Sequence, residues 1–135
     1  MCIRDRPLVV QPFIDSILDD GEYSLFYFIG EYSHAIQKKP KQGDFRVQEE
    51  YGAEIVSVDP VPSLLDSADR IMSLVEPVPA YARADFVRGR DGRFIVMELE
   101  LVEPSMYLRM DADAPRRFAE AFDQYVNNAT GRDMQ

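Results

Sequence analysis

The stretch YARADFVRGRDGRFIVMELEL, residues 81 to 101, contains two runs rich in aromatic and aliphatic residues on either side of a short polar segment. Asp91-Gly92 in that segment favours a tight turn, so the runs 81–87 and 94–101 predict a β-hairpin. Successive side chains of a strand point to opposite faces. On one face we expect Tyr81, Arg83, Asp85, Val87, Phe94, Val96, Glu98 and Glu100, and on the other, as the core face, Ala82, Ala84, Phe86, Ile95, Met97, Leu99 and Leu101.

Acidic residues in the middle of an apolar strand are the unusual feature of this hairpin. Directly opposed side chains lie about 5 Å apart, so Asp85, Glu98 and Glu100 are expected to meet, beside Arg83. A divalent cation relieves the repulsion among three carboxylates, and an all-oxygen cluster suits Mg²⁺ or Mn²⁺. A solvated polar sheet face explains the same acids, and spacing alone leaves both explanations open. A magnesium site of this kind implies a nucleotide, since Mg²⁺ completes its shell with waters and phosphates.

The remainder of the chain predicts four further strands and two helices. Residues 8–14 predict a short strand that Pro12 confines to an edge or a hinge. Residues 22–29 and 32–39 predict a second hairpin, with Gly30-Glu31 as its turn. A further strand is expected within 54–60, and helical periodicity is present at 62–75 and 113–127. Mostly antiparallel strands with two packed helices indicate an α+β fold.

Residues 40–53, PKQGDFRVQEEYGA, contain one Pro, two Gly and mixed charge, and predict a long loop of the kind that is often functional. Lys38, Lys39, Lys41 and Arg46 place four cations in or beside it. A solvated basic turn is the preferred explanation for the lysines. The Arg46 guanidinium can instead grip a phosphate or carboxylate with two hydrogen bonds, which favours a functional role.

Two other titratable residues receive no catalytic role. His34, the lone histidine, lies on a predicted strand, where a structural role is expected, and a single histidine excludes a multi-histidine metal site. Glu103 stands where its strand ends and is expected at the surface.

Composition restricts the class of protein. The 135 residues fit one domain, and the 46% hydrophobic content can supply a core. Acids outnumber Lys and Arg by 24 to 15, a net charge of −9 that argues against nucleic acid and anionic membranes as partners. No apolar run approaches the roughly 20 residues that span a bilayer, so a cytoplasmic location is the default expectation, with oligomerisation left open.

Several motifs in order resemble a known family. Glu22 after Gly21 is followed by HAIQKKP at 34–40, GDFRVQEEYGA at 43–53, YARADFV at 81–87 and MELELVEPS at 97–105. Together they resemble the C-terminal half of the ATP-grasp fold, in its glutathione-synthetase and ribosomal-protein glutamate-ligase branch. Two of them, GDFRVQEE and MELELVEPS, are more similar still to the cyclo-ligase of cycloserine biosynthesis and its relatives.

The resemblance implies an ATP- and Mg²⁺-dependent ligase that joins a small-molecule carboxylate to an amine, or closes a ring, through an acyl phosphate. The resemblance assigns residues 7–129 to the C-terminal portion of an ATP-grasp domain. Residues 1–6, MCIRDR, resemble translated adapter sequence and are expected to be a non-native leader, and residues 130–135 are expected to be a mobile tail. The family's N-terminal domain, with its glycine-rich loop and nucleotide-binding lysines, is absent from these residues. Weak nucleotide binding and little turnover are therefore expected of the chain alone.

The resemblance also implies roles for particular residues. The implied adenine-binding hinge is Gln11, Pro12, Phe13 and Ile14, and Glu22 is implied to bind the ribose hydroxyls. Asp85, Glu98 and Glu100 are implied to hold Mg²⁺. Arg83 is implied to steady the transferring phosphoryl group, and Arg46 to contact that group or the acyl substrate. Ser105 lies where relatives contact substrate, although a turn-forming serine explains it equally well.

Two departures from the family pattern stand out. Glu100 occupies a metal position that is often Asn, and Gly52-Ala53 replaces a frequent double glycine, so a positive φ angle at Ala53 would be strained. Two other functions remain as alternatives. One is a non-catalytic module whose acidic face binds a protein, and the other, within the enzymes, is a glutathione synthetase.

Overall fold

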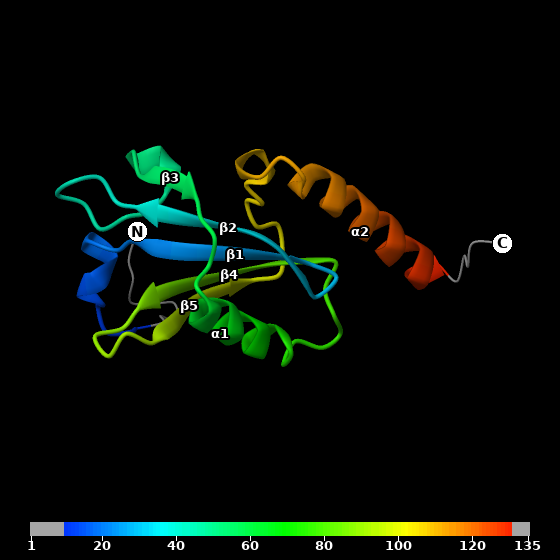
Figure 1. Cartoon of the computed structure of the whole chain (residues 1–135), viewed down its shortest axis with the longest axis horizontal. Helices are drawn as coiled ribbons and strands as arrows, with labels where there is room; N and C mark the ends of the chain where they lie inside the picture. Colours follow the sequence, from blue (N-terminus) through cyan, green and yellow to red (C-terminus); the bar gives the residue numbers. More distant parts are fainter. Residues whose placement is uncertain (1–9, 131–135) are drawn as a thin grey trace, which may run out of the picture.

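Five antiparallel strands form one sheet in the computed structural model, which describes residues 10–130 (Figure 1). The order across the sheet is β3-β2-β1-β4-β5. The strands are β1 (Glu22–Phe28), β2 (Glu31–Lys39), β3 (Glu54–Ser57), β4 (Tyr81–Arg88) and β5 (Phe94–Glu100), and the helices are α1 (Pro62–Met72) and α2 (Ala114–Thr130). Short 3-10 helices occur at Asp15–Leu18, Glu49–Tyr51 and Leu108–Met110. The predicted α+β class is confirmed.

Both predicted hairpins form, and their turns explain where the strands meet. The β1–β2 turn is Ile29-Gly30, one residue earlier than predicted, and both residues have positive φ angles, 49° and 79°. Positive φ at both central positions matches the right-handed twist of the flanking strands. In the β4–β5 connection, Gly92 has a φ of 80° and the Gly89 amide donates to the Arg93 carbonyl at 2.7 Å.

Helix α1 covers one face of the sheet and forms the main core. Pro62 starts the helix, where its missing N–H costs nothing, and the buried side of the helix carries Leu64, Ala68 and Met72. These pack against the sheet residues Tyr23, Leu25, Tyr27, Ala35, Ala82, Ala84, Phe86 and Leu99. Full burial of a side chain such as Leu64 contributes about 2 kcal/mol, so this face supplies much of the stability.

The opposite face is divided into an apolar half and a polar half. At one end, Phe118 of α2 lies edge-on to Phe28, with 5.2 Å between ring centroids, and also contacts Tyr81. In Figure 1, α2 begins over this end of the sheet and its second half extends beyond the ends of the strands. At the other end the same face carries charged side chains from β1, β2, β4 and β5. The candidate site lies there.

The predicted core face of β5 was wrong in part. Leu99 packs against the core, but Ile95 and Leu101 are 42% and 37% exposed. The pairing of β4 with β5 shifts between Asp85 and Phe86, which leaves Met97 as an extra residue and reverses the alternation beyond it. Phe94 therefore turns towards the core, whereas Leu101 lies beyond the end of the strand.

The expected strand at 8–14 does not form over residues 10–14, the part of it that the structure describes. Pro12 cannot donate a ladder hydrogen bond, and these residues form an extended segment before the 3-10 helix at Asp15–Leu18. Leu8 and Val9, the leader expected at 1–6 and residues 131–135 of the expected tail lie outside the described residues. Thr130 is the last residue of α2. No helix within residues 10–130 is both long enough and apolar enough to cross a membrane.

Candidate functional site

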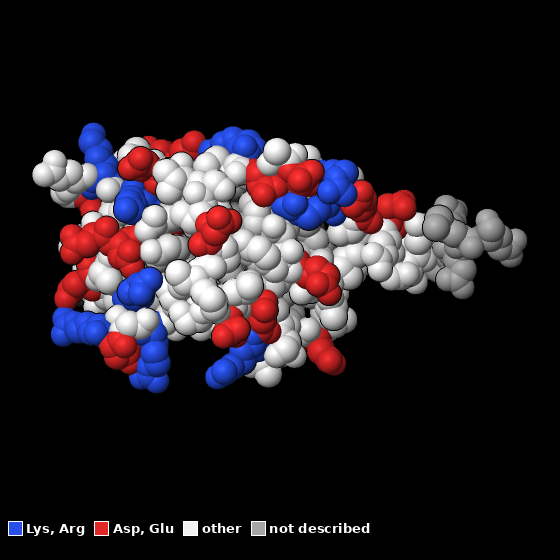
Figure 2. Space-filling view, in the orientation of Figure 1, with Lys and Arg blue, Asp and Glu red and all other residues white. Residues whose placement is uncertain are grey.

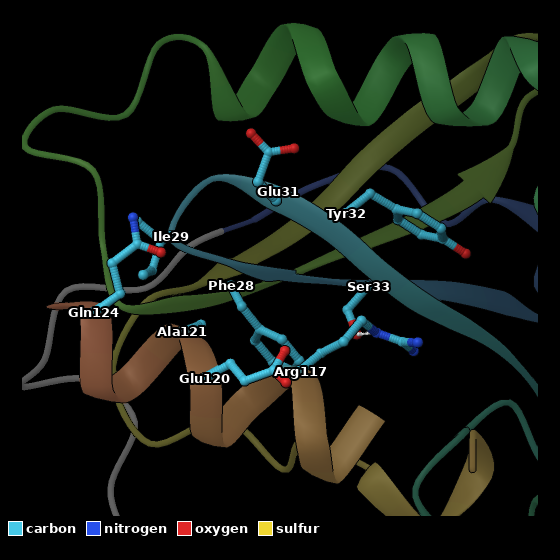
Figure 3. Close-up of a pocket in the computed structure, with 9 residues that line it drawn as sticks. All are labelled: Phe28, Ile29, Glu31, Tyr32, Ser33, Arg117, Glu120, Ala121 and Gln124. Atoms are coloured by element: carbon cyan, nitrogen blue, oxygen red, sulfur yellow. Dashed lines mark hydrogen bonds between the residues drawn. The ribbon is translucent and has the colours of Figure 1, made fainter. Parts of the chain in front are cut away.

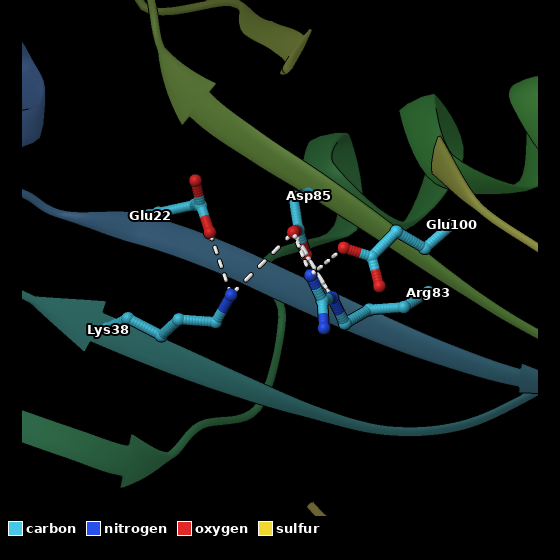
Figure 4. Close-up of polar contacts among 5 residues, drawn as sticks. All are labelled: Glu22, Lys38, Arg83, Asp85 and Glu100. Atoms are coloured by element: carbon cyan, nitrogen blue, oxygen red, sulfur yellow. Dashed lines mark hydrogen bonds and ion pairs between the residues drawn. The ribbon is translucent and has the colours of Figure 1, made fainter. Parts of the chain in front are cut away.

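Arg83 and Asp85 are the centre of the charged half of the sheet (Figure 4). Both project from β4 on the face opposite α1, and both are buried, with 8% and 1% of their surface exposed. The Arg83 guanidinium donates three hydrogen bonds to Asp85, at 2.9 to 3.1 Å, and one to Glu100 at 2.7 Å. Burial lowers the pKa of Arg83, but these carboxylates more than offset it, so the guanidinium stays charged.

Lys38 enters the same cluster from β2. Its Nζ atom lies 2.8 Å from Glu22 Oε1 and 3.6 Å from Asp85 Oδ2, and only 5% of the residue is exposed. Burial raises the pKa of Glu22, and Lys38 offsets only part of that effect. The preferred explanation of Lys38 as part of a solvated basic turn was wrong. The lysine instead connects β1 and β4 across the sheet face.

The predicted meeting of β5 acids with Asp85 is observed in the strand register. Glu98 lies directly opposite Asp85, and Glu100 lies opposite Arg83. Burial raises the pKa of Glu98, and the neighbouring carboxylates of Glu100 and Asp85 raise it further. Negative charge is therefore concentrated at this edge beyond what the two buried cations neutralise.

An apolar recess of about 220 Å³ adjoins the cluster, and the predicted hinge forms one of its walls. The recess is lined by Gln11, Pro12, Phe13, Ile14, Ile17, Phe45, Val87 and Met97. Val87 follows Asp85 by two residues on the same face of β4, so the recess and the cluster are separated by about 7 Å along the strand. The bulge on β5 presents Met97 to the recess.

Arg46 is held by its own loop rather than by the cluster. Its guanidinium pairs with Asp44 at 2.7 Å and lies 3.8 Å above the centre of the Tyr51 ring. The hydrogen bonds from Arg46 keep the pKa of Asp44 well below its usual range. The backbone strain considered for Ala53 is not found. Gly52 takes the positive φ angle, 81°, and Ala53 is not among the described residues with positive φ.

Ser24 adds a polar group that the sequence did not single out. It lies on β1 directly across from Asp85 and is fully buried, yet its hydroxyl has no hydrogen-bond partner among the described residues. A buried hydroxyl without a partner is costly and in native proteins is normally satisfied by water or a ligand. Lys38, Ser24 and Met97 were missed as site residues, and only the strand register could have placed them beside the predicted acids.

The donor chemistry of the cluster fits Mg²⁺ or Mn²⁺, since Glu22, Asp85, Glu98 and Glu100 provide only oxygen ligands. Within residues 10–130, however, no three His, Cys, Asp or Glu side chains converge closely enough to hold an ion as they stand. Arg83 lies between Asp85 and Glu100 and satisfies both. Metal binding by these acids therefore requires their side chains to turn away from Arg83.

His34 has the structural role expected of it. The residue is buried, its ring stacks on Phe26 with 4.3 Å between centroids, and Nε2 lies 3.1 Å from the Met106 carbonyl. Burial lowers the pKa of His34. Glu103 is exposed, as expected, and has a positive φ of 54°. Ser105 is also exposed, and its role stays a prediction.

A separate hollow of about 320 Å³ lies at the other end of the sheet, between the β1–β2 turn and α2 (Figure 3). Three charged residues, Glu31, Arg117 and Glu120, line it, and Arg117 already donates to Asp111 at 2.6 Å and to Ser33 at 3.0 Å. Neither the cluster nor the hinge contributes to its wall. Figure 2 shows Lys and Arg side chains interspersed with Asp and Glu over the visible face.

Comparisons with known proteins identify relatives of this chain and of its fold. No family model matches the chain. The cycloserine biosynthesis protein DcsG of Streptomyces lavendulae is 34% identical over 124 residues, which cover 84% of this chain and 40% of the relative. The crystal structure of D-cycloserine synthetase DcsG superposes with a TM-score of 0.73 at 30% identity, over 85% of this chain and 41% of that chain.

More distant structures share the fold. The ATP-grasp ligase PsnB, solved with a precursor variant, Mg and ADP, has a TM-score of 0.55 at 21% identity, over 79% of this chain and 34% of its own. The chain carries part of the ATP-grasp fold. D-alanine–D-alanine ligase from Bacillus anthracis, solved with ATP, shares this ATP-grasp portion with a TM-score of 0.53 at 18% identity, over 78% of this chain and 38% of that chain. The chain spans about two fifths of the length of the curated relative that it matches.

Proposed function

We propose that this ATP-grasp portion belongs to an ATP-dependent ligase. The enzyme would join a small-molecule carboxylate to an amine, or close a ring within one substrate, through an acyl phosphate. The proposal rests on one observation above all, the position of the apolar recess next to the charged cluster on one face of β4. A nucleotide has the same sequence of properties along its length, an apolar base followed by a polyanion.

The residues divide naturally along that direction. Residues 11–14 offer backbone groups and apolar surface for the base, with Val87 and Met97 opposite them. Glu22, the charged residue of β1, lies beside Val87, because the neighbouring residues Tyr23 and Phe86 pair with each other. Its carboxylate is suited to accept hydrogen bonds from ribose hydroxyls. The base, the sugar and the phosphates would then follow β4 from Val87 towards Arg83.

The far end of this path suits phosphoryl transfer, in which an enzyme chiefly positions groups and neutralises charge. Arg83 provides a charged guanidinium that can stabilise a phosphoryl group as charge develops on it. Asp85, Glu98 and Glu100 would hold Mg²⁺, which supplies charge neutralisation of the phosphates when bound. Arg46 would contact the phosphoryl group or the acyl substrate, as the resemblance to the ATP-grasp family implies.

Binding of ATP to the chain, followed by NMR titration so that weak affinity is measurable, tests the proposal. We expect Mg²⁺-dependent binding that weakens at least tenfold in Glu98→Gln and in Glu100→Gln, since each change removes a charged metal ligand. Glu103→Gln is the matched control, because Glu103 is exposed and lies just past β5. Equal affinity in all three variants would eliminate the metal site.

The rival function, a non-catalytic module whose acidic face binds a protein, predicts association that needs neither metal nor nucleotide. Shifts confined to residues lining the recess and the cluster, and dependent on Mg²⁺, would decide against it. A glutathione synthetase and a cyclo-ligase share the nucleotide path proposed here. Product analysis with candidate carboxylates and amines separates them.

A further inference from the structure

Lys38 is the one lysine that contributes an ion pair to the charged half of the sheet face within residues 10–130. Its two carboxylate partners come from different strands, Glu22 from β1 and Asp85 from β4, with β1 lying between β2 and β4. Lys38 therefore reaches across β1 to contact Asp85. The proposed function gives these two acids separate tasks, ribose binding and metal binding.

The burial of this group shows that its contacts hold Lys38 in one place. Only 6% of the Lys38 side chain is exposed, against 12% for Glu22 and 2% for Asp85. A buried ammonium is strongly unfavourable without partners, and here both partners are charged. The backbone supports the same position, because the Lys38 carbonyl packs directly against Gly21, whose missing side chain leaves the space.

Charge balance explains why a lysine is needed between the acids. The two carboxylates repel each other, and the charge of Asp85 adds to the rise that burial causes in the pKa of Glu22. Lys38 counters this repulsion from the side of β2, and Arg83 counters it from β4. Removing Lys38 would free Glu22 from its only ion pair among the described residues.

We propose that Lys38 is a positioning residue that holds the Glu22 carboxylate in the orientation that binds the ribose and ties it to Asp85 at the metal end of the site. This inference rests on the proposed function and deepens it. Lys38 acts through Glu22, so it determines how strongly the site prefers a nucleotide with ribose hydroxyls over one without them.

The test compares ATP with 2′,3′-dideoxy-ATP, each with Mg²⁺, on the wild-type chain and on variants. A carboxylate that accepts a hydrogen bond from a hydroxyl is worth roughly a tenfold or greater preference for ATP. We expect Lys38→Met and Glu22→Gln each to bring this ratio close to one, and the double variant to lose nothing more. Lys38→Arg should restore much of the ratio, whereas Lys39→Met, on the opposite face of β2, should keep it.

A Lys38→Met variant that weakens both nucleotides equally and keeps the wild-type ratio would overturn the inference, because a purely structural or electrostatic role predicts that result. A wild-type chain that binds neither nucleotide would refute the proposed function instead. The role of Lys38 is then decided on the free protein. If Lys38 positions Glu22, the double variant Lys38→Met/Glu22→Gln should lower the urea midpoint by less than the sum of the two single variants. A loss in the double variant equal to that sum would overturn the inference.

Discussion

Replacing Arg83 by Met is expected to destabilise the chain far more than an ordinary surface substitution. The change keeps most of the buried volume but removes four hydrogen bonds to Asp85 and Glu100. Asp85 is 1% exposed and would retain, among residues 10–130, only Lys38 at 3.6 Å as a cationic partner. Removing one partner of a buried ion pair costs about 3–5 kcal/mol, and the residual attraction to Lys38 points to the lower end, about 3 kcal/mol.

Urea unfolding followed by far-UV circular dichroism measures this loss. Arg88→Met is the matched control, since Arg88 lies on the same strand and pairs with Asp20 at 3.1 Å, but with side chains that are 42% and 32% exposed. Such a pair contributes about 0–1 kcal/mol. Adding Asp85→Asn to Arg83→Met should recover stability, because it removes the uncompensated charge. Equal losses for Arg83→Met and Arg88→Met, or no recovery in the double variant, would refute the reasoning.

Three further predictions concern pH and backbone packing. Because burial and neighbouring acids raise the pKa of Glu98, the folded state prefers its protonated form. Glu98→Gln should therefore gain stability relative to wild type as pH rises through the raised pKa. A stability difference in urea unfolding that does not depend on pH would contradict this prediction. Burial lowers the pKa of His34, so its NMR titration midpoint should lie below 6.5. The stability of the fold should fall as pH drops from 6.5 through that midpoint. A midpoint above 6.5 would contradict the described packing of His34. Gly21→Ala should lower the unfolding free energy by several kcal/mol, since a Cβ atom would strike the Lys38 carbonyl. Gly92 has a similar φ of 80° but open space around it, so Gly92→Ala should cost only about 1–2 kcal/mol. Equal costs for the two variants would argue against the close approach of Gly21 to Lys38.

Local patterns were sufficient to predict the β4–β5 hairpin and the cross-strand pairs of its acidic half. The alternation of side chains and the Asp91-Gly92 turn place Asp85 opposite Glu98, as observed. The bulge at Met97 was not predictable in the same way, because it is caused by the packing of the sheet against α1. Phe86 and Phe94 both reach that core only if one residue is inserted between the acidic half and the aromatic half of β5.

The misjudged lysine has a similar cause in the other hairpin. A turn at Gly30-Glu31 would place Lys39 opposite Glu22, with Lys38 on the other face. The observed turn is one residue earlier, which alone would move the partner of Glu22 by two residues, to Gln37. A register shift near Tyr27 reverses one of these two residues, so Glu22 pairs with Lys38. A slip of one residue exchanges the faces of a whole strand. The further contact of Lys38 with Asp85 depends on the order of strands in the sheet, which no short-range pattern specifies.

The two halves of the site face differ in what they contribute to the fold. The half beneath α2 packs Phe28, Tyr81 and Phe118 together, as an ordinary sheet face would. The other half buries Lys38, Arg83 and Asp85, an arrangement that hydrophobic residues of similar volume often match or exceed in stability. Because the fold gains little stability from these buried charges, most of its stability must come from the core packed against α1. Their burial beside an apolar recess, with the unpartnered Ser24 hydroxyl among them, is better explained by what the site binds than by what it stabilises.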